Sequence, residues 1–113
     1  MSCIFCEIIN GNIPSNTVYE DDMIKAFHDI EPAAPVHVII VPKKHIASAN
    51  DVIGDDAGYI ARIFECIPKI AKELGIADDG YRIINNCGKN GGQTVGHIHF
   101  HLLGGKDLGA KLV

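Results

Sequence analysis

Residues 97 to 103 read His97-Ile98-His99-Phe100-His101-Leu102-Leu103, and this heptapeptide says most about the fold. Polar and apolar residues alternate along it, as side chains alternate between the two faces of a strand. The pattern therefore predicts a strand with three histidines on one face and apolar side chains on the other. Each imidazole has a polar nitrogen that needs a partner, so three of them on one face are not ordinary core. By itself, the spacing also allows a solvated polar face or a short metal-binding tract.

A glycine-rich segment, residues 88–94, lies directly before this predicted strand. Its glycines allow a backbone to approach a ligand closely and to turn N–H groups toward it. Gln93 and Thr94 add neutral hydrogen-bond donors close to the first histidine. A phosphate held here would meet both donors and a nucleophile, because histidine, with an ordinary pKa of roughly 6.5, is partly neutral at physiological pH. The same glycines are also typical of a plain hairpin connection.

The rest of the chain predicts strands on both sides of one long helix. Apolar residues recur at helical spacing over 60–74, and Gly75 suits the cap that ends a helix. Pro68 lies inside this pattern and predicts a kink or a broken turn, or a division of the helix in two. A short N-terminal helix is predicted over 3–10, and strands are predicted over 17–20, 23–29, 36–42, 81–86 and 95–103. This order indicates an α+β fold with an antiparallel sheet of about five strands, because a doubly wound fold needs alternating helices.

Length and charge limit the functions that the chain can have. With 113 residues, of which 47% are apolar and 21% charged, we expect a single domain over residues 1–113. The net charge of −4 and the lack of a basic run longer than Lys43-Lys44 argue against a nucleic acid polymer as partner. The apolar runs are far shorter than the roughly 20 residues of a membrane helix. No leader is apparent, so we expect a cytoplasmic protein without a membrane partner.

The four cysteines are Cys3, Cys6, Cys66 and Cys87. In the reducing compartment that we expect, a disulfide framework is the weaker interpretation. Cys3 and Cys6 have the C-x-x-C spacing of half a zinc site, but no second pair of cysteines completes it. The spacing alone is therefore a modest indication of metal binding.

Several segments together resemble the histidine triad (HIT) family, whose signature is three histidines separated by apolar residues. The matching segments are 92–105, 4–6, 13–15, 26–30 and 41–45, which span most of the chain. The Gly104-Gly105 pair favours the branch of histidine triad nucleotide-binding proteins, typically purine nucleoside phosphoramidases. Gln93-Thr94 also occurs in the dinucleoside polyphosphate hydrolases, so that branch remains an alternative. The resemblance implies the HIT-like fold and homodimers that meet through the long helix and the sheet edges.

The resemblance also implies a hydrolase that cleaves P–N or phosphoester bonds of nucleoside monophosphate derivatives, above all nucleoside phosphoramidates. His99, the middle histidine, would be the nucleophile and would form a nucleotidyl-histidine intermediate. His101 would bind and orient the phosphate, and no cofactor is required for the chemistry. The implied nucleotide-binding residues are Phe27, His28, Asp29, Ile30, Asn86, Gln93, Thr94, His99 and His101.

Each of these assignments has a plainer structural alternative. An isolated aspartate such as Asp29 commonly caps a turn, and Phe27 and Ile30 have the character of core residues. Asn86 can be an ordinary residue at the end of a strand. His37, in the middle of an apolar strand, is predicted to be a structural histidine.

Many microbial members of the family bind zinc, and the matching positions here are Cys3, Cys6, His45 and His97. Four protein ligands would make a closed, structural site that contributes folding energy. The alternative at these positions is a pair of reduced cysteines without metal. Two further functions stay open: a zinc hydrolase that uses the three histidines of the triad as ligands, and a nucleotide-binding regulator with negligible turnover.

Overall fold

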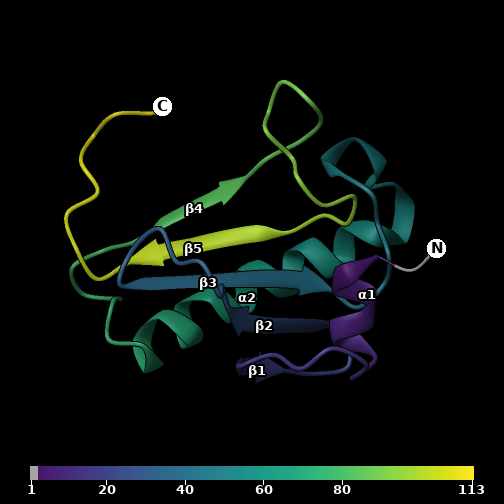
Figure 1. Cartoon of the computed structure of the whole chain (residues 1–113), viewed down its shortest axis with the longest axis horizontal. Coiled ribbons are helices and arrows are strands. Elements are labelled where there is room, and N and C mark those ends of the chain that lie inside the picture. The colour runs from purple at the N-terminus through teal and green to yellow at the C-terminus, as the bar shows by residue number, and fades with distance from the viewer. Residues whose placement is uncertain (1–2) are drawn as a thin grey trace.

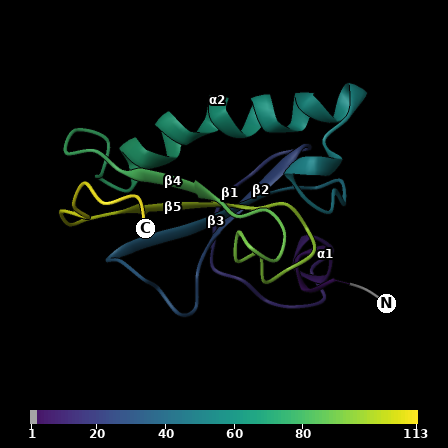
Figure 2. The ribbon, with the colours of Figure 1, turned by 90° about the horizontal axis from the view of Figure 1, so that it is seen from above.

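The computed structural model describes residues 3–113, and its central element is a five-stranded antiparallel sheet (Figure 1). The strands lie in the order β1-β2-β3-β5-β4. Figure 2 shows that helix α2 covers one face of this sheet, while the short helix α1 lies on the opposite side. The elements are α1 (Ile4–Ile9), β1 (Thr17–Glu20), β2 (Ile24–His28), β3 (Val36–Pro42), α2 (Ala57–Glu73), β4 (Arg82–Asn85) and β5 (Phe100–Gly104). The predicted α+β class, with about five antiparallel strands and one long helix, is confirmed.

Strand β3 is the middle strand of the sheet and carries apolar side chains on both faces. Val38 and Ile40 belong to the main core under α2, whereas Ile39 and Val41 belong to a smaller core under α1. All four are buried, and full burial of an aliphatic side chain of this size stabilises the fold by about 1.5–3 kcal/mol. The two cores fix α2 and α1 to opposite faces of the same sheet.

Helix α2 is continuous from Ala57 to Glu73, so it does not divide at Pro68. Pro68 is exposed, and the carbonyl group that loses its helical partner there can be hydrated instead. The buried residues of the helix are Ile63, Cys66, Ile67, Ile70 and Ala71. Phe64, which the helical spacing placed with them, is 47% exposed, and its ring centroid lies 5.7 Å from that of Phe100. In the described part of the chain, no helix is long and apolar enough to cross a membrane.

The predicted last strand, 95–103, is wrong at its beginning. The paired part starts at Phe100, where the registers with both β3 and β4 end. Upstream of this point the backbone leaves the sheet, and the N–H of Ile98 donates to the carbonyl oxygen of Ile46 at 2.7 Å. The sequence pattern could not show this change of partner, because the residues before Phe100 still alternate as they would in a strand.

The predicted alternation of side chains is nevertheless present in this segment. Its apolar members lie in the core under α2, which includes Ile98, Phe100 and Leu102. His97 and His99 lie on the other side, where the ring of Phe5 contacts both, with ring centroids 6.0 and 5.0 Å away. The histidines therefore face the side of the sheet on which α1 lies.

Candidate active site and metal centre

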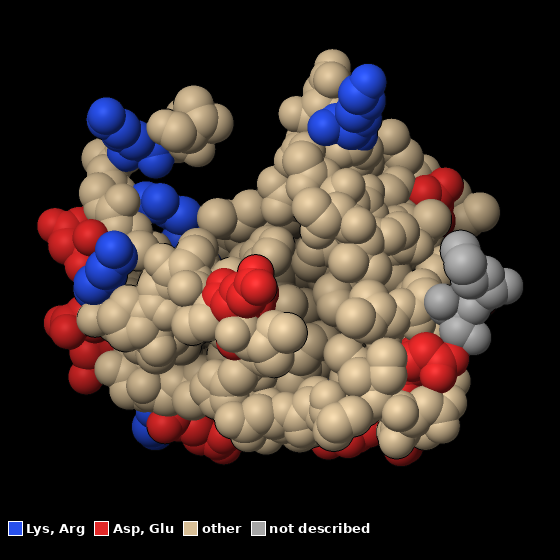
Figure 3. Space-filling view, in the orientation of Figure 1, with Lys and Arg blue, Asp and Glu red and all other residues tan. Residues whose placement is uncertain are grey.

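A cavity of about 470 Å³ opens on the side of the sheet that carries α1, a size within the usual range for small-molecule sites. The cavity is mainly apolar; among the described residues that line it, Asp29 is the one acidic side chain and none is a lysine or an arginine. Figure 3 shows this face as largely uncharged, with one acidic patch near its middle and basic side chains toward its edges. An anionic group bound here would therefore depend on neutral donors and histidines. The lining residues are Ile4, Phe5, Ile8, Ile13, Pro14, Ser15, Asn16, Phe27, His28, Asp29, Ile30, Ile39, Thr94, Val95, His99 and His101.

The hydrogen bonds of His99 assign the proton on its ring. Nδ1 of His99 lies 2.8 Å from the carbonyl oxygen of His97. A carbonyl oxygen only accepts, so Nδ1–H of His99 is the donor. In the neutral ring, Nε2 then carries the free lone pair. The ring is only 3% exposed, yet it lines the cavity. His99 thus has the tautomer that a nucleophilic histidine needs.

A second chain of hydrogen bonds assigns the proton on His101. The N–H of Ala33 donates to Nδ1 of His37 at 3.0 Å, so Nε2 of His37 carries that ring's proton. This Nε2–H donates to Nδ1 of His101 at 2.8 Å. In neutral His101 the proton is therefore on Nε2. The ring centroids of His99 and His101 are 5.1 Å apart, so a lone pair and an N–H donor lie side by side at the cavity.

His37 makes a contact with the triad that the sequence analysis did not anticipate. It was predicted to be a structural histidine, and it is buried; it also contacts His101 directly and lies 3.5 Å from a carboxylate oxygen of Asp29. The signal that would reveal it is the register of β3 beside β5, in which His37 pairs with Leu103 and Ile39 with His101. That register depends on tertiary pairing and cannot be read from the sequence of either strand.

Burial keeps two of the triad histidines neutral. Desolvation lowers the pKa of His101 below its ordinary value of 6.5, and the neighbouring His99 and His37 lower it further, against the opposite effect of Asp29. Desolvation also lowers the pKa of His97, although its hydrogen bond to the carbonyl oxygen of Pro42 acts in the opposite direction. Both rings are therefore neutral at pH 7.

Asp29 combines a structural contact with a position at the cavity. Its Oδ1 accepts a hydrogen bond from the N–H of Glu31 at 2.8 Å, which is the turn-capping role considered above. Nearby, Phe27 is buried against Phe5, with ring centroids 5.7 Å apart, and it lines the cavity at the same time. Ile30 also lines the cavity and is 95% exposed, so it is available to cover a bound ring.

The structure brings most of the predicted nucleotide-binding residues to one cavity, but not Asn86 or Gln93. The amide group of Gln93 makes three hydrogen bonds with backbone groups, at 2.7 to 2.9 Å. Nδ2 of Asn86 donates to the carbonyl oxygen of Gly91 at 2.7 Å. Both amides thus shape the glycine-rich loop. The predicted residues that do line the cavity are Phe27, His28, Asp29, Ile30, Thr94, His99 and His101.

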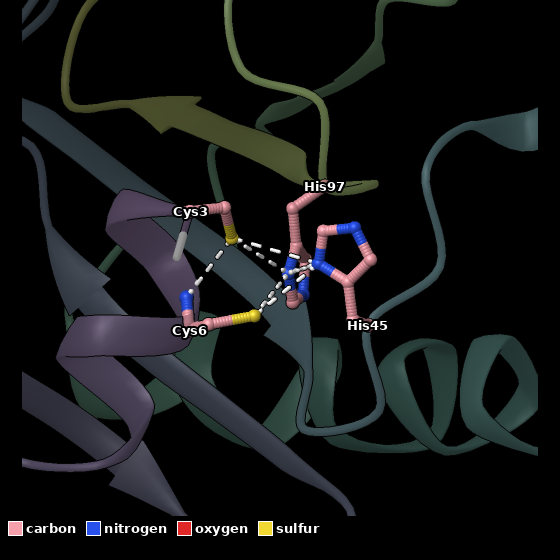
Figure 4. Close-up of side chains that lie close together, drawn as sticks. All are labelled: Cys3, Cys6, His45 and His97. Carbon is pink, nitrogen blue, oxygen red and sulfur yellow. Dashed lines mark hydrogen bonds between the residues drawn. The ribbon is translucent and has the colours of Figure 1, made fainter. Parts of the chain in front are cut away.

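Beside the cavity, the four predicted metal ligands converge (Figure 4). The sulfur-to-nitrogen distances between the cysteine Sγ atoms and the histidine Nδ1 atoms are 3.2 to 3.6 Å, and the two Nδ1 atoms are 3.2 Å apart. A tetrahedral zinc ion with ordinary bond lengths gives edges of about 3.5 Å from sulfur to nitrogen and about 3.3 Å between nitrogens. The donor set therefore fits zinc. Its members are Cys3 and Cys6 at the start of α1, His45 after β3 and His97 before β5.

The surroundings of these ligands also suit a metal. Nε2–H of His97 donates to the carbonyl oxygen of Pro42 at 2.9 Å, which leaves the lone pair of Nδ1 directed at the cysteines. Burial, with the hydrogen bond and charge of Cys3, raises the pKa of the Cys6 thiol to about 11. A metal that binds here must displace that proton. Cys66 is buried in the core under α2 and takes no part in this group.

The three histidines of the triad do not form one metal site. Among the described residues, no group of convergent donors contains His97, His99 and His101 together. His97 belongs to the cysteine group, and His101 lies with Asp29 and His37. In this second group the lone pairs of both imidazoles accept hydrogen bonds, so it is a hydrogen-bonded chain. A hydrolase that uses the triad as zinc ligands does not agree with this geometry.

Comparison with known proteins gives one consistent result. The family model described as the HIT domain matches residues 10–108. The chain is 49% identical to the purine nucleoside phosphoramidase of Escherichia coli K12 over 109 residues, which is 96% of this chain and 92% of that protein.

Solved structures extend the likeness to the fold. A histidine triad protein from Clostridium difficile superimposes with a TM-score of 0.94 at 50% identity, covering 98% of this chain and 96% of the other. A HIT family hydrolase from Clostridium thermocellum gives a TM-score of 0.96 at 49% identity, with 99% and 97% covered. Together with the histidine pattern and the sheet that carries it, these matches show that the chain belongs to the HIT family.

Proposed function

We propose that the protein is a hydrolase of nucleoside phosphoramidates, or of related nucleoside monophosphate derivatives, that acts through a covalent intermediate on His99. The observation that carries the proposal is the pair of ring tautomers at the cavity. His99 has a free lone pair on Nε2, and His101 beside it has an N–H donor. The phosphoramidase activity named for the Escherichia coli relative supports the same substrate class.

The reaction follows from these two groups. Nε2 of His99 attacks the α-phosphorus, the P–N bond breaks, and the leaving nitrogen takes up a proton from the solvent and departs as an amine. The ring then carries a positive charge, which the carbonyl oxygen of His97 stabilises through Nδ1–H. Water next attacks the phosphorus, the bond to Nε2 breaks, the nucleoside monophosphate is released, and the proton lost by the water returns to the solvent. His101 keeps its proton and stabilises the phosphoryl oxygens by a hydrogen bond from Nε2–H.

The other cavity residues would hold the nucleoside. Asp29 would accept hydrogen bonds from the ribose hydroxyls, and Phe27 and Ile30 would contact the base, for which we expect a purine. Thr94 would donate to the phosphate from the end of the glycine-rich loop. Direct phosphate contacts by Asn86 and Gln93 stay a prediction. The Gln93 amide would have to exchange a present hydrogen bond for such a contact, because both its N–H groups donate to backbone carbonyls, whereas Nδ2 of Asn86 has a second N–H.

An acid-quench experiment tests this function. The protein is mixed with adenosine 5′-phosphoramidate, quenched within milliseconds to seconds and digested for mass spectrometry. We expect an adenylyl group on the peptide that contains His99. Product without any adduct on that peptide would contradict the covalent mechanism, and neither product nor adduct would favour the regulator with negligible turnover. A parallel reaction with a dinucleoside polyphosphate tests the other branch of the family.

We propose that Cys3, Cys6, His45 and His97 hold a structural zinc ion, as their convergence supports. When bound, the ion would join the start of α1 to the segments around His45 and His97, and it would take no part in the reaction. Cys3, Cys6, Cys66 and Cys87 are free thiols in the structure, and free thiols are typical of reducing compartments. This observation supports the cytoplasm as the compartment in which the protein works.

We further propose a homodimer that meets at β4 and α2. Within the described sheet, β4 pairs only with β5, so its other edge is free, and an open edge favours pairing with another chain. Phe64 adds a half-exposed aromatic ring on α2. Sedimentation equilibrium is expected to give twice the mass of the chain. Phe64→Glu should weaken the dimer at least about tenfold by placing a charge in an apolar contact.

Ile53 supplies the matched control for this experiment, because it is an exposed apolar side chain outside α2. Ile53→Glu introduces the same charge and is expected to leave the dimer intact. A monomeric wild-type protein, or equal weakening by the two substitutions, would contradict the proposed interface.

A further inference from the structure

Phe5 connects the metal centre to the active site. It lies between Cys3 and Cys6 in the sequence, on the helix that carries both. Its ring contacts the imidazole of His97, a proposed metal ligand, and the imidazole of His99, the proposed nucleophile. Phe5 also lines the cavity. One buried side chain thus contacts a group at the metal centre, the nucleophile and the space for the substrate.

His97 makes a second connection through its own atoms. Nδ1 of its ring points to the sulfur atoms of the cysteines, at 3.4 and 3.6 Å. Its carbonyl oxygen accepts the hydrogen bond from Nδ1–H of His99, at 2.8 Å. A movement of this residue therefore changes the hydrogen bond that sets the tautomer of the nucleophile.

The segment after His45 makes a third connection. The carbonyl oxygen of Ile46 accepts from the N–H of Ile98, and that of Ala47 accepts from Nε2 of Gln93, both at 2.7 Å. The loop that carries one metal ligand is therefore bonded to the triad segment and to the glycine-rich loop.

Helix α1 needs these attachments because it is short. It has six residues, and isolated helices of that length are not stable in water. Besides the cysteines, it is held by the buried side chains of Phe5 and Ile8 and by Lys25, whose Nζ donates to the carbonyl oxygen of Ile8 at 3.4 Å. The position of this wall of the cavity thus depends on few contacts, and a metal at Cys3 and Cys6 would add two strong ones.

From these contacts we propose that metal binding and nucleotide binding are thermodynamically coupled, and that Phe5 is the positioning residue that transmits the coupling. Metal at the four-ligand site holds α1, α1 holds Phe5, and Phe5 holds the ring of His99 and one wall of the cavity. Nucleotide in the cavity contacts the same wall and therefore favours the metal-bound arrangement. The proposal rests on the nucleotide-binding function proposed above.

Calorimetric titration tests the coupling in both directions. Adenosine 5′-monophosphate is titrated into zinc-loaded protein and into protein stripped of metal by a chelator, with circular dichroism to confirm that both are folded. We expect the zinc-loaded form to bind about tenfold more tightly, a typical size for such coupling. Because linkage is reciprocal, saturating nucleotide should lower the zinc dissociation constant by the same factor, measured by competition with a chromophoric chelator.

A pair of variants tests the role of Phe5. Phe5→Leu keeps every metal ligand and an apolar side chain, and we expect it to reduce the coupling to less than about threefold. Ile30→Ala is the control, because Ile30 lines the same cavity but follows β2, is 95% exposed and lies outside the core cluster that contains Phe5. It is expected to weaken nucleotide binding in both forms equally and so to preserve the tenfold ratio.

The outcomes separate this proposal from the one on which it rests. Equal nucleotide affinity with and without zinc would overturn the coupling and leave the proposed function standing. Full coupling in Phe5→Leu, or its equal loss in Ile30→Ala, would overturn the role of Phe5. If neither form binds the nucleotide, the proposed function fails and the coupling fails with it.

Discussion

Replacing His99 with alanine is expected to lower the turnover of a nucleoside phosphoramidate by about 10⁴-fold or more. The substitution removes the atom that forms the bond to phosphorus, and the remaining groups only bind and orient the substrate. The ring lines the cavity and its Nδ1–H bonds to the carbonyl oxygen of His97, which leaves Nε2 to react. The neighbouring His101 has its proton on Nε2 and so has no free lone pair there. Steady-state kinetics with chromatographic detection of the nucleoside monophosphate measures the loss.

The same variant should still bind nucleotide. The base and ribose contacts come from other residues, among them Phe27 and Asp29, so we expect the dissociation constant for adenosine 5′-monophosphate to change by less than about tenfold. A loss of binding as large as the loss of turnover would mean that the cavity has collapsed. Turnover within about tenfold of wild type in a folded protein would refute His99 as nucleophile.

His37 provides a graded comparison for this experiment. His37→Gln keeps a polar side chain but disturbs the hydrogen bond to Nδ1 of His101. It acts through another residue, so we expect a loss of about 10- to 100-fold, far below that of His99→Ala. A shift in the pH dependence of turnover should accompany it, because His37 contributes to the lowered pKa of His101.

The histidine strand shows how far sequence reasoning reaches. The alternation of residues 97–103 placed the imidazoles on one side of the sheet and Ile98, Phe100 and Leu102 on the other, because alternation is a property of any extended backbone. It could not locate the start of β5, which depends on where β3 and β4 stop pairing. It also missed the contact between His37 and His101, because that contact depends on the register between two strands.

The four metal ligands could not be predicted from local sequence patterns alone. Cys3 and Cys6 alone are half of a site, and nothing in their spacing selects His45 or His97 among the six histidines of the chain. The resemblance to the HIT family identified the two partners, and the fold brings all four side chains together from three separate segments. For Gln93, the residue type was informative but its partners were not predictable. Its role as a donor was read from residue type, but the backbone groups that it bonds to are known only from the fold.

Replacing Cys6 with serine is expected to abolish zinc binding and to lower the thermal midpoint of unfolding by about 10 °C or more. A serine hydroxyl stays protonated and is a poor ligand for zinc, so three donors remain where four converge. A ligand that binds only the native state stabilises it by about 4 kcal/mol at a thousand times its dissociation constant. For a chain of this length, that free energy corresponds to a shift of this size in the midpoint.

Cys87 supplies the matched control, since it lies outside the metal group and is also a free, partly exposed cysteine. Cys87→Ser should keep one zinc ion per chain by elemental analysis and should keep the wild-type midpoint. A chelator should lower the midpoint of wild type and of Cys87→Ser but leave that of Cys6→Ser unchanged, because only the first two have metal to lose. One zinc ion per chain in Cys6→Ser, or a wild-type midpoint that no chelator alters, would show that these four residues do not hold a structural metal. With no ion to fix α1, the coupling through Phe5 would then have no source, so this measurement bears on the metal centre and on the regulation of the active site together.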